Sequence, residues 1–305
     1  MDAPMLPETY KIRDLWRDQT LRRVFLDIIS NTQLKKCKQL KPLLIRKISD
    51  LVHNNAPDRQ IYAELYRFVH SELPREVRCK IQHKSRYRSV NRANKIVEFI
   101  SCHLYPNDRK TKGLPKIDSV LDLGCGEGSI TNVVGRLLGL RRTNIHGCDV
   151  LPPNEEEARL FTYRMLAHQD RNRLPYEDKQ HQVIYAFMSL HHIAGVERTL
   201  AEVYRVLQPG GIFIIREHDC VTDGLALVLD VVHGFYSMVW SNPQEKKDFE
   251  SEYWAKYRTA RELEEVVVGQ GFERVLSTHR DEPFPLYSKG KVLNPLKYYY
   301  AVYRK

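Results

Sequence analysis

The sequence predicts an α/β protein: a mostly parallel sheet with helices on both faces, preceded by an α-helical region. Two observations carry this prediction. From residue 117 onward, short β-prone apolar runs alternate with helical stretches, whereas the first hundred residues show only helical periodicity. The composition, with 42% hydrophobic and 28% charged residues in a chain of 305, is that of a globular protein and excludes collagen, coiled coil and wholesale disorder.

The helical region is expected to hold three amphipathic helices and a fourth at its end. Apolar residues recur at spacings of three and four over 21–29, 40–52 and 61–73. The fourth helix, over about 85–103, should bury Ile96 and Phe99 on one side and carry Arg88, Arg92 and Lys95 elsewhere. A loop rich in Pro, Asn, Lys and Gly follows over 105–116.

Six apolar runs are expected to form strands, at 119–123, 144–148, 182–187, 211–215, 273–278 and 298–303. Helical stretches separate the first four, which predicts that those strands are parallel. The last two are joined by a long connection over 280–296 that contains three prolines and no helical periodicity. An antiparallel final strand fits this connection.

The charge of the chain is unevenly distributed. Residues 1–116 hold 25 Lys and Arg against 12 Asp and Glu, a net charge of +13, whereas the remainder has a net charge of −3. This asymmetry predicts an N-terminal basic helical extension over 1–84 and a second domain over 85–305, whose motifs lie in 117–220. It favours an anionic partner for the first part.

The cysteines and the apolar segments predict the compartment. The six cysteines include no Cys-x-x-Cys pair and no Cys/His cluster at metal-ligand spacing, so reduced thiols and no metal site are expected. The N-terminus has no secretory signal, and the best apolar run, 225–232, is interrupted by Asp230 and is too short to cross a bilayer. A soluble, intracellular and cytoplasmic protein is therefore expected.

The sharpest motif is 120–128, which reads Val-Leu-Asp-Leu-Gly-Cys-Gly-Glu-Gly. Glycines at alternate positions after a strand let the backbone approach a ligand closely and aim a helix N-terminus at it. Asp149 ends the next strand, 23 residues after Gly126, where a carboxylate can accept both ribose hydroxyls of a nucleoside-containing cofactor. Asp170 follows at a place suited to an adenine edge.

Five ordered segments together resemble the class I S-adenosylmethionine-dependent methyltransferases, in particular the type 11, ubiquinone-biosynthesis subgroup. They are 120–128, Asp149, Asp170, the Met-Ser-Leu-His-His-Ile run at 188–193 and the Arg-Val-Leu-Gln-Pro-Gly-Gly run at 205–211. The resemblance implies a Rossmann-like, seven-stranded sheet and S-adenosyl-L-methionine as cofactor. It assigns the methionine part to the glycines, the amino group to Asp122 or Glu127, the ribose to Asp149 and the adenine to Asp170. The cofactor set is Asp122, Gly124, Gly126, Glu127, Gly128, Asp149, Asp170 and Phe187.

Methyl transfer from a sulfonium is an in-line displacement, so any base belongs at the carboxyl ends of the strands. The polar side chains there are His191 and His192 after one strand and Arg216, Glu217, His218 and Asp219 after the next. Of these, His191, His192, Glu217 and His218 are the catalytic candidates. Lys95 joins them because it matches the first lysine of the Lys-Asp-Lys-Glu tetrad of RNA 2′-O-methyltransferases. The rest of that tetrad is not matched, since Ala186 and Phe187 stand where its Asp is expected and Arg216 replaces a lysine.

The acceptor is predicted less sharply than the donor. The charge asymmetry favours RNA, so the predicted function is an RNA methyltransferase that acts on a cap, a ribose or a base, with the basic N-terminal helices as RNA platform. Its basic substrate-binding set consists of Lys84, Arg86, Arg88, Arg92 and Arg216. Interleaved aromatics such as Tyr62 and Tyr87 would stack on bases, although Tyr66 and Phe68 are expected in the helical core. The 188–193 run favours the alternative, a small-molecule or lipid methyltransferase with a helical lid. A non-catalytic nucleic-acid-binding relative is the third hypothesis.

Overall fold

The computed structural model describes residues 11–32, 34, 39–72, 86–104, 117–153, 155–167, 169–240, 253–279, 287–288, 291–292 and 298–305. The chain forms two compact units. The first contains Met1–Lys84, Cys220–Ala255 and Glu282–Lys297, and the second contains Ser85–Asp219, Lys256–Asp281 and Tyr298–Lys305. Each is described separately.

The second unit is built on a seven-stranded sheet with the order β3-β2-β1-β4-β5-β9-β6. The strands are β1 (Val120–Leu123), β2 (Ile145–Asp149), β3 (Thr162–Met165), β4 (His181–Phe187), β5 (Leu207–His218), β6 (Glu273–Ser277) and β9 (Tyr298–Arg304). The first five strands are parallel, and β9 runs antiparallel to both β5 and β6. β1 and β4 therefore lie at the centre, where both faces of the sheet are covered.

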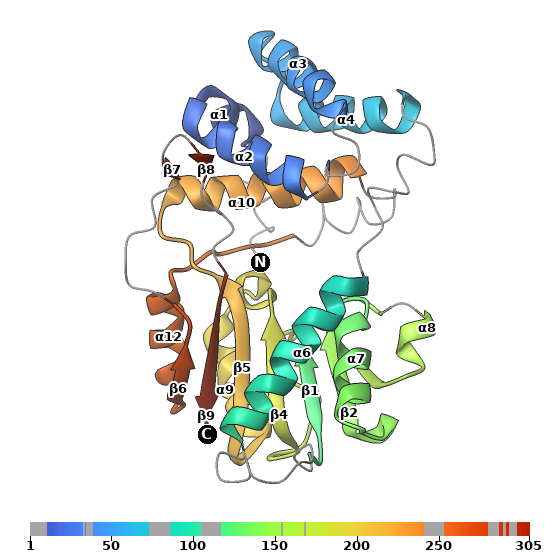
Figure 1. Ribbon diagram of the computed structural model, residues 1–305, viewed down its shortest axis with the longest axis vertical. Coiled ribbons are helices and arrows are strands. Elements are labelled where there is room, and N and C mark those ends of the chain that lie inside the picture. Colours follow the sequence, from blue (N-terminus) through green and yellow to red (C-terminus); the bar gives the residue numbers. More distant parts are fainter. Residues whose placement is uncertain are drawn as a thin grey trace. The chain divides into compact units, whose positions relative to one another are not determined.

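Helices cover both faces of this sheet (Figure 1). They are α6 (Arg86–His103), α7 (Ser129–Leu137), α9 (Val196–Val206) and α12 (Ala260–Val268), with the short segments η2 (Arg142–Asn144), α8 (Glu155–Ala158) and η3 (Leu190–His192). α6 and α7 pack with Val120, Ile212 and Ile214 in one hydrophobic core. α9 and α12 pack with the alternate strand residues Leu121, Phe213 and Ile215 in the other. Successive side chains of each strand thus enter opposite cores.

The first unit is helical. Its elements are α1 (Ile12–Arg17), α2 (Gln19–Asn31), α3 (Leu40–His53), α4 (Asp58–Glu72), α10 (Asp223–Phe235), the π-helical turn η4 (Tyr236–Trp240) and a small hairpin of β7 (Tyr287–Ser288) and β8 (Lys291–Val292). Phe25, Tyr62 and Trp240 are buried in its common core. Segments far apart in the sequence, at 12–72 and 223–240, therefore bury the same apolar surface.

The predicted fold class is confirmed, including the antiparallel last strand. The helices expected over 21–29, 40–52, 61–73 and 85–103 correspond to α2, α3, α4 and α6. Strand β3 and helix α1 were not predicted by position. Thr162–Met165 is a half-exposed edge strand without an apolar run, and α1 is only six residues long. Within the described residues, no helix has the length and apolarity that crossing a membrane requires.

Candidate active site

The loop between β1 and α7 is open at its centre and closely packed at both ends. Gly124, Gly126 and Gly128 have φ values of +77°, +52° and +81°, in the left-handed region that favours glycine. A Cβ at Gly124 would lie 2.4 Å from Ser189 Cβ, and one at Gly128 would lie 2.6 Å from Phe161 Cε1. A Cβ at Gly126 would meet no heavy atom within 4 Å. Gly126 is exposed, and we call the open space at its Cβ position, close to the start of α7, the cradle.

Asp149 connects the end of β2 to this cradle. Its carboxylate accepts the N–H groups of Gly126 and Val150, over 2.8 and 2.7 Å, and that of Leu151 over 3.4 Å. Burial raises the pKa of Asp149, and these N–H groups oppose the shift. Tyr163 of β3 supports the turn, because its hydroxyl lies 3.0 and 2.8 Å from the carbonyl oxygens of Asp149 and Leu151. The carboxylate is therefore fixed beside Gly126.

Asp122 lies beneath the loop and is 4% exposed. The Thr131 hydroxyl donates to its Oδ2 over 2.7 Å. Burial raises the pKa of Asp122 to about 7, against the opposing effects of the Thr131 and Tyr185 hydroxyls. Burial therefore favours the protonated form of this carboxyl group. Thr131 was not among the predicted residues. The only sequence signal for it is its position on the helix that follows the glycine loop, nine residues after Asp122.

The turn after β4 joins the glycine loop to β5. The Ser189 hydroxyl donates to the Leu123 carbonyl over 2.9 Å, and the Met188 N–H donates to the Arg216 carbonyl over 2.8 Å. Met188 has a φ of +60°, which is uncommon for a residue with a side chain. Ser189 and Met188 therefore fix the spacing between the end of β1 and the end of β5.

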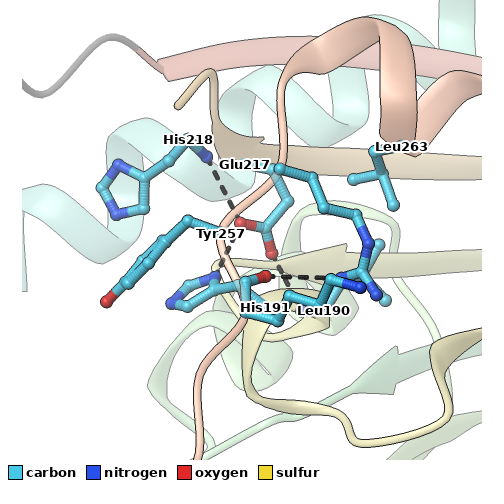
Figure 2. Close-up of a pocket in the computed structure, with 8 residues that line it drawn as sticks. Leu190, His191, Glu217, His218, Tyr257 and Leu263 are labelled. Carbon is cyan, nitrogen blue, oxygen red and sulfur yellow. Dashed lines mark hydrogen bonds and ion pairs between the residues drawn. The ribbon is translucent and has the colours of Figure 1, made fainter. Parts of the chain in front are cut away.

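Glu217 and His191 form a buried pair beyond this turn (Figure 2). Glu217 Oε2 lies 2.7 Å from His191 Nδ1, and Oε1 accepts the Leu190 N–H over 2.8 Å. The Tyr257 ring stacks on the His191 ring, with centroids 5.2 Å apart. The His218 ring meets the His191 ring edge-on, with centroids 5.4 Å apart. The cavity among these side chains has a volume of about 10 Å³, which is close to the minimum for one water molecule.

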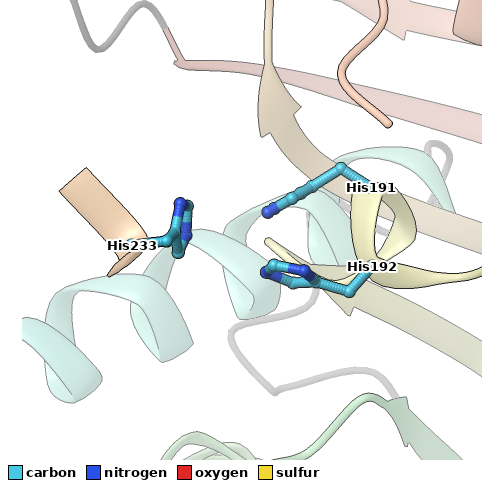
Figure 3. A group of neighbouring side chains, drawn as sticks. All are labelled: His191, His192 and His233. Carbon is cyan, nitrogen blue, oxygen red and sulfur yellow. The ribbon is translucent and has the colours of Figure 1, made fainter. Parts of the chain in front are cut away.

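His192 is less buried than its neighbour. The centroids of the two histidine rings are 4.0 Å apart, and the ring planes are tilted by 46°. Figure 3 shows both side chains. Four of the predicted catalytic residues, His191, His192, Glu217 and His218, are thus brought together at the carboxyl ends of β4 and β5.

Asp219, which the sequence places among the polar side chains after the fifth core strand, is a further buried carboxylate. It is 0% exposed; its Oδ1 accepts the Ala260 N–H over 2.9 Å, and its Oδ2 lies 3.0 Å from His279 Nδ1. Glu217 anchors the turn after β4, whereas Asp219 anchors the start of α12. Glu217 lies near the end of β5 and Asp219 follows directly after this strand, but the sequence did not show their partners His191 and His279, which lie 26 and 60 residues away.

Arg216 points to the opposite face of β5 from Glu217. Its guanidinium carbon lies 3.9 Å from the centroid of the Tyr298 ring and 5.8 Å from that of Tyr300. Phe187, predicted to touch the cofactor, is buried beside Tyr300 with centroids 5.7 Å apart. These side chains belong to the face of the sheet that α6 and α7 cover.

The remaining predicted residues are dispersed. Lys95 lies on α6, where its ammonium pairs with Glu98 over 2.7 Å and lies 4.9 Å from the Phe99 ring centroid. Glu127 and Asp170 are exposed, and Arg92 is half-buried on α6. Lys84 and the side chains of Arg86 and Arg88 lie outside the described residues. Lys95 and Glu217 belong to opposite faces of the sheet, so the structure does not bring all five catalytic candidates together.

The central part of this chain is similar in sequence to known methyltransferases. Residues 121–215 match the family described as a methyltransferase domain. The chain is 31% identical over 103 residues to the sterol 4-C-methyltransferase of Caenorhabditis elegans, covering 31% of this chain and 29% of that protein. It is 27% identical over 173 residues to the demethylmenaquinone methyltransferase of Lactobacillus johnsonii, covering 53% of this chain and 70% of that protein.

The solved structure of an S-adenosylmethionine-dependent methyltransferase from Mesorhizobium loti covers 63% of this chain and 94% of its own, with 17% identity and a TM-score of 0.41. The match to the sterol methyltransferase spans less than a third of that enzyme's length.

The glycine loop, the strand order and the family match define residues 121–215 as a class I methyltransferase domain. S-adenosylmethionine is the cofactor of this class, as the motifs predicted. The residues present fit it. The open cradle at Gly126 admits a ligand, and the anchored carboxylate of Asp149 next to it keeps acceptor capacity for hydroxyl groups.

Proposed function

We propose that the protein is an enzyme that transfers a methyl group from S-adenosylmethionine to a small organic acceptor. The observation that carries this proposal is the open glycine cradle with the Asp149 carboxylate fixed 2.8 Å from the Gly126 nitrogen. When bound, S-adenosylmethionine supplies an electrophilic methyl group on a sulfonium. The contribution of the chain is then to bind, to align and to exclude water.

The residues of the cofactor half have distinct roles in this proposal. The backbone of Gly124–Gly128 allows close approach of the methionine part, and Asp149 accepts the ribose hydroxyls. Asp122, in its ionised form, or Glu127 receives the amino group. Asp170 and Phe187 are proposed to contact the cofactor as well, Asp170 from an exposed turn and Phe187 from the buried end of β4.

On the acceptor side, we assign His191 and Glu217 to positioning. Their cavity of about 10 Å³ is too small for an organic acceptor, and the pair fixes the turn that carries Ser189. His192, which is more exposed, and His218 are the proposed bases for an acceptor that loses a proton. Lys95 is proposed only for an acceptor that reaches α6.

A small acceptor is favoured over RNA by the surroundings of the N-terminal aromatics and cations. Tyr62 and Phe68 are buried in the core of the first unit, so their rings are not available for base stacking. Several basic side chains of that region pair with carboxylates, as Arg13 does with Asp58 and Arg67 with Glu64. The relatives named above act on sterols and demethylmenaquinone, which are small apolar molecules.

Calorimetric titration with S-adenosylmethionine tests the cofactor assignment. Gly126→Gln places a side chain in the cradle and is expected to abolish binding, whereas Gly139→Gln is the matched control. Gly139 also has a positive φ, +64°, and open space around its Cβ position, so the two variants carry similar backbone strain. Asp149→Ala should weaken binding at least tenfold, by loss of charge-assisted hydrogen bonds. Unchanged affinity in both Gly126→Gln and Asp149→Ala would refute the assignment.

RNA remains the second candidate, on the strength of the net charge of +13 over residues 1–116. A radiolabelled methyl-transfer screen against capped RNA, uncapped RNA and a metabolite extract separates the two. We expect incorporation into the metabolite fraction. Incorporation into RNA alone, together with loss of RNA affinity and of its salt dependence when Arg86, Arg88 and Arg92 are replaced by Glu, would establish the RNA platform instead.

A further inference from the structure

Arg216 is a buried cation that pairs with no carboxylate among the described residues. It is 7% exposed, its Nη1 atom is buried, and among the described residues no carboxylate or carbonyl accepts from that nitrogen. The contacts of the guanidinium are the Tyr298 and Tyr300 rings. Arg205 in the same unit shows the usual solution, with hydrogen bonds to Glu202, Asp178 and two carbonyl groups. Burying an unpaired charge is costly. An anionic group of a ligand can therefore supply the partner of Arg216.

The position of Arg216 relates it to the cofactor loop. Only β4 separates β5 from β1, and neighbouring strands lie about 4.8 Å apart, so the two strand ends are roughly 10 Å apart. The Met188 and Ser189 hydrogen bonds hold this spacing on both sides of β4. A molecule of a few carbon–carbon bonds can span it. Tyr298 is 36% exposed, so the ring that covers the guanidinium also reaches the surface.

We propose that Arg216 binds a carboxylate on the methyl acceptor, which makes the acceptor an organic acid with an apolar or aromatic body. This inference rests on the proposed methyl transfer. A guanidinium whose face lies on an aromatic ring keeps its N–H groups in plane for bidentate contact with a carboxylate. Tyr298, Tyr300 and Phe187 supply the apolar lining. The carboxylate of the cofactor itself offers the same chemistry, and the test distinguishes the two sources.

The test uses the full chain, with benzoate as the probe and benzamide as its neutral counterpart, at ionic strength matched with sodium chloride. We expect benzoate, and not benzamide, to raise the Tm of the wild-type protein. Arg216→Met should weaken benzoate binding in calorimetry about tenfold or more, as expected for a lost charge-assisted contact. Arg164→Met is the control, because Arg164 also lies over a tyrosine ring, at 5.1 Å from Tyr176, but bonds the Pro175 carbonyl.

The ligand-free Tm gives an independent readout. Removing a buried cation that has no anion should leave the Tm of Arg216→Met equal to or above that of the wild type. A lower Tm would indicate a structural arginine and would overturn the proposal. Equal stabilisation of the wild type by benzoate and benzamide, or equal benzoate affinity in wild type and Arg216→Met, would overturn it as well.

Titration of the same variants with S-adenosylmethionine separates this inference from the proposed function. Similar cofactor affinity in wild type and Arg216→Met is expected. No cofactor binding by the wild type would refute the proposed function while the benzoate result still stands. A tenfold loss of cofactor affinity in Arg216→Met alone would assign the guanidinium to the cofactor carboxylate and overturn the acceptor proposal.

Discussion

The glycine loop after β1 and the polar cluster after β5 lie at the same edge of one sheet, but different contacts hold them. The loop is fixed by backbone geometry and short-range hydrogen bonds, such as those from Gly124 and Cys125 to the Cys148 carbonyl. The cluster is fixed by two buried carboxylates, Glu217 and Asp219, whose partners come from the turn after β4, from α12 and from His279.

This difference predicts different responses to substitution. A loop held by backbone conformation is sensitive to added atoms, because its glycines leave no room or adopt positive φ values. A cluster held by buried charges is sensitive to removed atoms, because each partner left behind stays buried and polar. The glycine loop should therefore be destabilised by substitutions that add side-chain atoms, and the polar cluster by substitutions that remove them.

The largest effect is expected for Glu217→Ala. The change removes the acceptor for both the Leu190 N–H and His191 Nδ1, and breaking a buried pair in this way costs about 3–5 kcal/mol of the free energy of unfolding. Urea unfolding measures it. Glu217→Gln, which keeps an acceptor oxygen, should lose less. The control is Glu264→Ala, which breaks a more exposed pair with Arg274 at a cost of about 0–1 kcal/mol. Equal losses for Glu217→Ala and Glu264→Ala would contradict the buried-anchor interpretation.

The next effect tests the other half of the edge. Gly124→Ala adds a Cβ 2.4 Å from Ser189 Cβ at a φ of +77°, and strain plus overpacking should cost about 3 kcal/mol. Gly139→Ala, at a φ of +64° with open space, carries only the backbone part, about 1 kcal/mol. Adding Ser189→Gly to Gly124→Ala relieves the steric part. Urea unfolding of the single and double variants measures the coupling, and strictly additive losses would show that the close approach is unimportant.

The sequence predicted the glycine loop from a local pattern, whereas the cofactor roles of its residues stay a prediction. Gly124, Gly126 and Gly128 stand at alternate positions, so a local pattern predicts their loop. Asp149, 23 residues after Gly126, was placed by its position at the end of the next predicted strand. Asp219 and its partner His279 are 60 residues apart, and no local pattern links them. The edge strand β3 was missed because its half-exposed residues lack an apolar run, a signal that only a covered strand must carry.

The basic N-terminal region shows the limit of composition as a guide. Counting Lys, Arg, Asp and Glu gives the net charge of this region, but it does not show which cations have partners or which aromatic side chains are buried. Arg22 illustrates the point, because it lies over the Trp16 ring and donates to the Trp16 carbonyl. The helical periodicity of α2, α3 and α4 was predicted correctly because a buried stripe repeats every 3.6 residues whatever the partner.

The smallest effect is a pH dependence in the cofactor half, at Asp122. Burial raises the pKa of Asp122 from 3.8 to about 7, so the folded state favours the protonated carboxyl group. The stability contributed by this preference is complete below pH 3.8 and is lost as the pH rises to about 7. Between pH 6 and pH 8, the wild type should therefore lose about 1 kcal/mol of the free energy of unfolding that Asp122→Asn does not lose.

Urea unfolding of the wild type and Asp122→Asn at both pH values checks this difference, and Thr131→Val serves as the matched variant. Without the Thr131 hydroxyl, which stabilises the ionised form, the pKa of Asp122 should rise further and the loss should shift to higher pH. Parallel pH profiles for wild type and Asp122→Asn would show that this carboxyl group ionises freely. The cofactor should respond in the opposite sense. Where the ionised carboxylate receives the amino group, S-adenosylmethionine affinity increases as the pH rises through about 7 in the wild type and stays flat in Asp122→Asn.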